Sequence, residues 1–120
     1  MKILMSELVR ARDVLTRIMK LELPIRESYM IAKFMRETNG DMDFYSETLK
    51  KIISETKDSN STDKELKILP DKVEDFNKKT YELDNQEVEI NPLELNFNGM
   101  PQDSKFTPED IYWIFPILKV

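Results

Sequence analysis

The chain has 120 residues, of which 40% are hydrophobic and 34% charged, and its formal net charge is −5. It contains no cysteine and no histidine, which excludes disulfides, thiolate nucleophiles, imidazole acid–base chemistry and the usual zinc sites. With only two glycines, Gly40 and Gly99, a glycine-rich phosphate-binding loop is excluded as well. These features are typical of one soluble globular domain with a thin core, and no cofactor or metal is expected.

The first segment predicts a short strand followed by an amphipathic helix. Residues 2–5 suit an edge strand, and Ser6 is a good N-cap for a helix that ends near Lys20 or Leu21. No secretory signal and no stretch of roughly 20 apolar residues is present, so we expect a cytoplasmic protein or one packed into a particle, with no membrane partner. The apolar face of the predicted helix consists of Leu8, Ala11, Val14, Leu15, Ile18 and Met19.

Pro24 predicts the start of a second helix, because proline suits the first helical position and disfavours helix in the residue before it. The connection through Glu22 and Leu23 is short, which favours an antiparallel helical hairpin over residues 1–56.

The second helix carries a stripe of small and apolar residues at alternating steps of four and three, as in a coiled coil. Asn39-Gly40-Asp41 is locally a helix stop signal, but the stripe passes through it in phase. One long helix, kinked or straight, is therefore favoured over two helices. Its second half extends beyond the first helix and requires a cover: the C-terminal part, a second copy or a target. The stripe consists of Ile31, Met35, Thr38, Met42, Tyr45, Leu49, Ile52 and Thr56.

The second half of the chain predicts a small α+β part. Residues 57–64 form a polar linker, and residues 65–69 suit a short strand. A helix is predicted to begin at Pro70, because Val73, Phe76, Thr80 and Leu83 have helical spacing. Strict alternation then predicts strands over 87–90 and 93–97. A last helix begins after Thr107 with proline next and an acid at its third position, and it ends at Pro116.

The fold class predicted from these elements is α+β. Residues 1–56 form an N-terminal antiparallel helical hairpin with a long second helix, residues 57–64 are a linker, and residues 65–120 pack on the hairpin within a single domain. This last part contributes a small antiparallel β-sheet and short C-terminal helices.

Two clusters of acidic and polar residues are candidates for a metal-binding or catalytic site. Residues 58–62 resemble the start of an EF-hand calcium loop, but Asp63 stands where glycine is needed and Leu69 where glutamate is needed. Asp41, Asp43 and Glu47 are an acidic patch without a nucleophile or a metal-binding histidine. Neither cluster predicts catalysis, and the protein is expected not to be an enzyme.

Three groups of residues are candidates for binding a protein partner, and each has a plainer interpretation. The second half of the stripe, which extends beyond the first helix, is a candidate binding surface, or it is part of the protein's own core. The run of acidic residues from Glu82 to Glu89 either mimics the phosphates of a nucleic acid or is the solvent-exposed face of strands. The aromatic group, which includes Phe115, is a binding anchor or, as the favoured interpretation, a plug of the core. Direct nucleic-acid binding is not expected, because the arginines alternate with acids in an acidic chain. The candidates are Met42, Tyr45, Leu49, Ile52, Glu82, Asp84, Glu87, Glu89, Tyr112 and Trp113.

The opening sequence KILMSELVRARDVLTRIMKLELPIRESYMIAKFMRE resembles small, mostly uncharacterised phage and prophage proteins with an N-terminal helical hairpin. Some of these also end with a threonine- or serine-proline helix start and an apolar terminus, as residues 106–115 do here. The resemblance implies a phage origin and identifies no catalytic residue. Small size, acidity, missing catalytic chemistry and a candidate interaction surface favour an accessory protein that binds and inhibits a host defence factor. The alternative is a virion or assembly component, and a homodimer is compatible with both.

Overall fold

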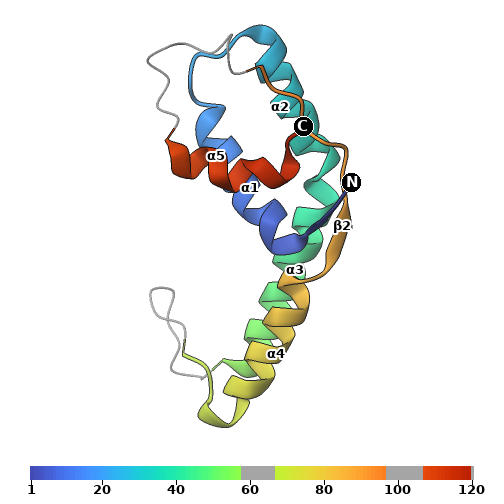
Figure 1. Cartoon of the computed structure of the whole chain (residues 1–120). Helices are drawn as coiled ribbons and strands as arrows, with labels where there is room; N and C mark the ends of the chain where they lie inside the picture. The colour runs from blue at the N-terminus through green and yellow to red at the C-terminus, as the bar shows by residue number, and fades with distance from the viewer. Residues whose placement is uncertain (58–66, 97–106, 120) are drawn as a thin grey trace.

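The computed structural model describes residues 1–57, 67–96 and 107–119, which are mostly helical. Figure 1 shows an elongated molecule, with extents of 52 × 29 × 23 Å, whose two termini lie near each other. The elements in chain order are β1 (Lys2–Leu4), α1 (Met5–Ile18), α2 (Ile25–Glu37), α3 (Asn39–Thr56), the 3₁₀ helix η1 (Pro70–Lys72), α4 (Val73–Asp84), β2 (Glu87–Glu89), α5 (Pro108–Ile114) and the 3₁₀ helix η3 (Phe115–Ile117).

The sheet consists of β1 and β2, which pair antiparallel with Ile3 opposite Val88. The strand predicted over 87–90 is thus confirmed as β2, and Val88 is buried between two exposed glutamates, as its alternation requires. The strand predicted over 93–97 is wrong for its described part, because residues 93–96 form only a single parallel bridge, between Leu93 and Leu118. Pro92 lacks the N–H that would continue a ladder.

The strand predicted over 65–69 is likewise reduced to one bridge in its described part, residues 67–69. There Ile68 pairs antiparallel with Lys57. Most of the predicted linker lies outside the described residues, since only Lys57 of it is described.

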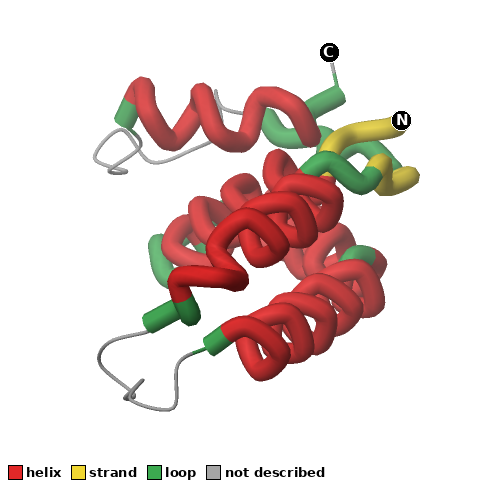
Figure 2. Tube along the Cα trace, turned by 90° about the horizontal axis from the view of Figure 1, so that it is seen from below, coloured by secondary structure: helices red, strands yellow, loops and turns green. Residues whose placement is uncertain are grey.

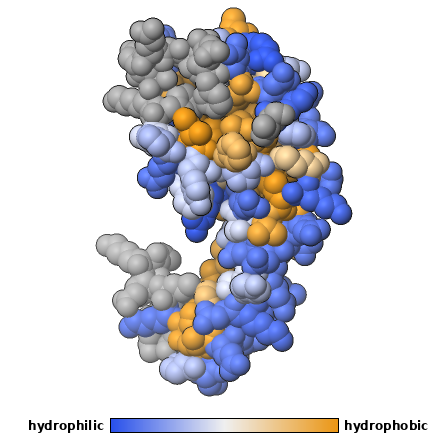
Figure 3. Space-filling view, in the orientation of Figure 1, coloured by the Kyte–Doolittle hydropathy of each residue, from blue (hydrophilic) through white to orange (hydrophobic). Residues whose placement is uncertain are grey.

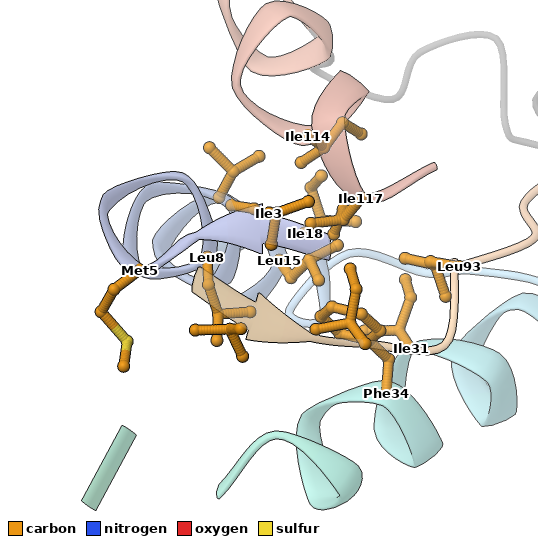
Figure 4. Close-up of a cluster of buried hydrophobic side chains, with 14 residues drawn as sticks. Ile3, Met5, Leu8, Leu15, Ile18, Ile31, Phe34, Leu93, Ile114 and Ile117 are labelled. Carbon is orange, nitrogen blue, oxygen red and sulfur yellow. The ribbon is translucent and has the colours of Figure 1, made fainter. Parts of the chain in front are cut away.

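The main core is built on α1, whose apolar face is almost completely buried. In Figure 4, Ile114 and Ile117 reach this face from one side, and Ile31 and Phe34 of α2 reach it from another. Figure 2 shows α5 and η3 as a separate layer next to the other helices, with the strands at one end. The buried members of this core are Ile3, Met5, Leu8, Ala11, Val14, Leu15, Ile18, Ile31, Phe34, Val88, Ile90, Leu93, Ile114 and Ile117.

Helix α1 begins earlier and ends earlier than its sequence predicts. Leu4, not Ser6, is the N-cap, and its N–H donates to the Glu7 carboxylate over 3.0 Å. The pairing of β1 explains this start, since the N–H of Met5 still donates to the Gln86 carbonyl at 2.8 Å. The helix ends at Ile18, so Met19 leaves the apolar face and is 45% exposed.

The single long helix predicted after Pro24 is divided at Thr38, where φ is −101° and ψ is 3°. Two side chains explain the division. The Thr38 hydroxyl donates to the Phe34 carbonyl at 2.9 Å, and Arg12 of α1 donates to the Met35 carbonyl at 2.8 Å. Side chains that bind helical carbonyls in this way bend helices. The favoured prediction of one long helix is therefore wrong, since the chain forms two helices, α2 and α3, that meet at Thr38.

Gly40 is not the stop signal that its neighbours suggest. It lies inside α3, its φ is not positive, and a Cβ built on it meets nothing within 4 Å. The bond from the Thr38 N–H to the Phe34 carbonyl, at 3.1 Å, ends the ladder of α2, and the bond from the Met42 N–H to the Thr38 carbonyl, at 3.2 Å, begins that of α3. Thr38 is thus the residue at which the two helices meet.

The inward orientation of the stripe is confirmed, since each of its positions from Ile31 to Thr56 is buried or half-buried. Its second half is covered by α4, which lies alongside α3 in the lower part of Figure 1. Ile52 and Leu83 are buried there but do not belong to the main core. The α3–α4 pair thus forms an arm with a small apolar cluster of its own. The C-terminal segment therefore does not cover this half of the stripe and packs on α1 instead.

The most extensive contacts between helices are those of α3 with α4 and of α1 with α5. Helices α1 and α2 meet mainly through side chains, so their antiparallel hairpin stays a prediction. Within the described ranges, no helix has the length and apolarity that crossing a membrane requires.

Replacing Gly40 with alanine should stabilise the protein by roughly 0.4–1 kcal/mol, because it removes freedom from the unfolded chain at a position with space for a methyl group. Urea denaturation of the two proteins measures the change. A destabilised Gly40→Ala variant would contradict the right-handed backbone at this position.

Replacing Met42 and Leu49 together with glutamate should lower the free energy of unfolding by roughly 2–5 kcal/mol, because both half-buried side chains face the interior. Thermal denaturation followed by circular dichroism measures the loss. Glu47→Ala on the exposed face of α3 is the matched control and should melt like the wild type. An unchanged melting temperature of the double variant would refute the stripe as a packing surface.

Candidate functional site

Helix α5 is held at its start by a reciprocal cap. The Thr107 hydroxyl accepts a hydrogen bond from the Asp110 N–H at 3.2 Å, and the Asp110 carboxylate accepts one from the Thr107 N–H at 3.0 Å. Pro108 occupies the first helical position, as predicted. The start of α5 was therefore readable from Thr107, Pro108 and Asp110 alone.

Asp110 also ties α5 to α1, because Arg17 of α1 donates a hydrogen bond to its carboxylate. Asp110 is only 5% exposed. Burial acts to raise the pKa of Asp110, but the hydrogen bonds from Thr107 and Arg17 and the charge of Arg17 outweigh burial and lower it. The ionised form of Asp110 thus fixes the orientation of α5 on α1.

The two faces of the last segment have opposite environments. Ile114 and Ile117 are fully buried in the main core. Ile111, Tyr112 and Phe115 lie on the other side and are 41%, 68% and 59% exposed. The favoured interpretation of the aromatic group as a core plug is therefore wrong for Tyr112 and Phe115, because the isoleucines fill that place.

Trp113 lies at the boundary between the two faces and is half-buried. The guanidinium carbon of Arg10 lies 4.4 Å from the centroid of its ring, and Tyr112 meets the same ring edge to face at 4.9 Å. The indole N–H points to the Glu109 carboxylate at 3.5 Å. Trp113 thus connects α1 to the exposed aromatic residues.

These side chains border an open groove of about 590 Å³ between the start of α1 and the C-terminal segment. In Figure 3, hydrophobic residues gather over the region of α5 and α1, surrounded by hydrophilic ones. We call this site the aromatic groove. It is lined by Ser6, Glu7, Arg10, Pro108, Ile111, Tyr112, Trp113, Phe115 and Pro116.

The candidates on α3 are placed toward the interior. Met42 and Tyr45 pack against the main core, Leu49 is half-buried, and Ile52 is buried near Leu83 of α4. Burial first, and then the charges of Asp84 and Asp13, raise the pKa of Tyr45. A cover for these positions is thus supplied by the chain itself.

The acidic candidates are spread over two elements. Glu82 is exposed on α4 and Asp84 half-buried near its end, while Glu87 and Glu89 are exposed on β2. Glu89 accepts a hydrogen bond from the amine of Met1 at 2.8 Å. These positions agree with solvated faces of a helix and a strand, and mimicry of nucleic acid stays a prediction.

Arg12 occupies the junction of α1, α2 and α3. Besides the Met35 carbonyl, it donates to the Thr38 hydroxyl at 2.5 Å and to the Asn39 side chain at 3.0 Å. Burial lowers the pKa of Arg12, and the charges of Asp43 and Asp41 oppose that shift. Asp41 and Asp43, two of the three acids of the acidic patch, thus lie close enough to Arg12 to oppose the effect of burial on its pKa.

Sequence reasoning missed Arg10 and Ile111 as members of the aromatic groove, whereas Phe115 was already part of the aromatic group. The signal for Ile111 was its spacing, because positions 110, 114 and 117 mark one face of a helical turn and positions 111, 112 and 115 mark the other. No comparable signal existed for Arg10, since its contact with Trp113 depends on how α5 crosses α1.

Among the described residues, no group of acidic side chains could hold a metal ion. The segment with partial EF-hand similarity, residues 58–62, lies outside the described residues. Comparisons with family models, curated proteins and solved structures found no match to this chain.

Replacing Asp110 with asparagine should lower the free energy of unfolding by roughly 1–3 kcal/mol at neutral pH, because the charged hydrogen bonds to Thr107 and Arg17 are weakened. The pKa of Asp110 is lowered in the folded state, so this contribution is complete above its ordinary value of 3.8 and is lost as the pH falls through the lower folded value. Urea denaturation across the acidic range should show the two proteins converging at low pH.

Glu109→Gln is the control for this experiment, because Glu109 is the exposed neighbour of Asp110. It should leave the pH dependence of stability close to that of the wild type. A constant difference between wild type and Asp110→Asn at all pH values would contradict the role of the carboxylate charge.

Proposed function

We propose that this protein acts by binding another protein through the aromatic groove and that it is not an enzyme. The observation that carries this proposal is the exposure of Ile111 and Tyr112 of α5 together with Phe115 of η3. Exposed clusters of large apolar side chains mark interaction sites, and aromatic residues and arginine dominate the energetics of interfaces.

The support of the groove by the rest of the fold favours this use. Helix α5 is fixed by its cap, by the pair of Arg17 with Asp110 and by the burial of Ile114. A surface held in place before binding loses less conformational entropy when a partner docks.

The sequence supplies the biological setting of the proposal. On the resemblance of its opening segment, the protein is a phage-encoded accessory factor, and its partner is a host protein whose activity it blocks. The helical hairpin of α1 and α2 is part of the same proposal, since Arg12 bridges the two helices. The acidic charge of residues 58–120, formally −7, and the lack of histidine and cysteine agree with a binding role.

Replacing Tyr112 and Phe115 together with serine should weaken partner binding at least about tenfold without unfolding the chain, because both side chains are exposed. Affinity purification from a bacterial host lysate, followed by mass spectrometry, identifies proteins retained by the wild type. Calorimetry with the purified partner then measures the affinity of each variant.

The matched control is Tyr81→Ser, because Tyr81 on α4 is 69% exposed, close to the 68% of Tyr112. The partner should be retained by wild type and by Tyr81→Ser and lost by the double variant. Equal retention by all three proteins would overturn the groove as the binding site. Ordered self-association, or incorporation into purified phage particles, would favour a virion component instead.

A further inference from the structure

Arg10 is the cation that lines the aromatic groove. Its guanidinium lies over the face of Trp113, and among the described residues it has no hydrogen-bond acceptor or ion-pair partner. A guanidinium that stacks on a ring keeps its N–H donors in its own plane. These donors are therefore available to a bound molecule.

The acids around Arg10 already have other partners. Glu7 accepts a hydrogen bond from the Leu4 N–H, and Glu109 lies against the indole N–H of Trp113. Asp110 is engaged by Thr107 and Arg17. Among the described residues, Arg10 thus has no ion-pair partner and lies next to exposed apolar side chains, and the same lining holds the acid Glu7.

A bound carboxylate is the group that complements this arrangement. Two parallel N–H donors of arginine match two carboxylate oxygens, and a pair formed at the edge of an apolar groove is less screened by water than a pair on an open surface. A nucleic acid fits poorly, because recognition of its phosphates needs several cations and the described residues of the groove lining offer one.

We propose that the aromatic groove takes a peptide segment of a partner protein in which an aspartate or glutamate lies next to large apolar residues. The apolar side chains pack on Ile111, Tyr112 and Phe115, and the carboxylate pairs with Arg10. This inference rests on the proposed function and adds the chemistry of the partner. Beyond the proposed function, we thus infer a preference of the groove for acidic segments.

The test uses a displayed library of short random peptides that lack tryptophan. Peptides are selected on the full-length wild type and counter-selected on Tyr112→Ser/Phe115→Ser. Trp113 is the only tryptophan of the chain, so its fluorescence reports binding at the groove directly. Selected peptides should be enriched in acidic residues adjacent to apolar ones.

A double-mutant cycle then assigns the contact. Changing the peptide carboxylate to its amide should weaken binding to the wild type at least about tenfold, and should change binding to Arg10→Met little, because the pairing donor is absent. Arg10→Met keeps most of the apolar stem and should melt like the wild type. Arg36→Met, on the exposed side of α2, is the control and should behave as the wild type does.

The outcomes separate this inference from the proposed function. Peptides that bind the groove without acidic enrichment, or a cycle without coupling to Arg10, overturn the carboxylate preference and leave the groove as a binding site. No peptide surviving counter-selection overturns both. Dimerisation in ultracentrifugation that Tyr112→Ser/Phe115→Ser abolishes overturns the inference, because a second copy then occupies the groove.

Discussion

The apolar face of α1 is the surface on which most of this fold is assembled. Leu8, Ala11 and Leu15 are completely buried, and the side chains that cover them come from α2, from the sheet and from the C-terminal segment. Because one helix serves several neighbours, the last residues of the chain are recruited to the first. The groove is a direct result, since it forms where the C-terminal segment crosses the start of α1.

Periodicity in the sequence predicted those features that depend on local chemistry. The stripe from Ile31 to Thr56 faces inward, β2 alternates as expected, and Thr107 caps α5. Periodicity could not predict the cause of the division at Thr38, because one of the side chains involved, Arg12, belongs to another helix. Leu93 does not belong to a strand, because within the described residues it forms a single bridge, to Leu118 in the C-terminal segment.

The candidate site shows the same limit more clearly. Composition indicated that the aromatic C-terminus matters, but not which of its residues are buried. Ile114 and Ile117 fill the core next to α1, and the helical spacing then leaves Tyr112 and Phe115 exposed. On α3 the reverse occurred, since α4 covered the residues that seemed to need a partner.

The separate apolar cluster of the α3–α4 arm has a consequence for motion. Ile52 and Leu83 form a much smaller buried group than the one around α1, and exposed ion pairs such as Lys79 with Glu55 add little to it. Units with few buried contacts open with less free energy than the whole protein. Amide hydrogens of α4 therefore exchange with solvent sooner than those of α1, and proteases reach the arm while the groove stays folded.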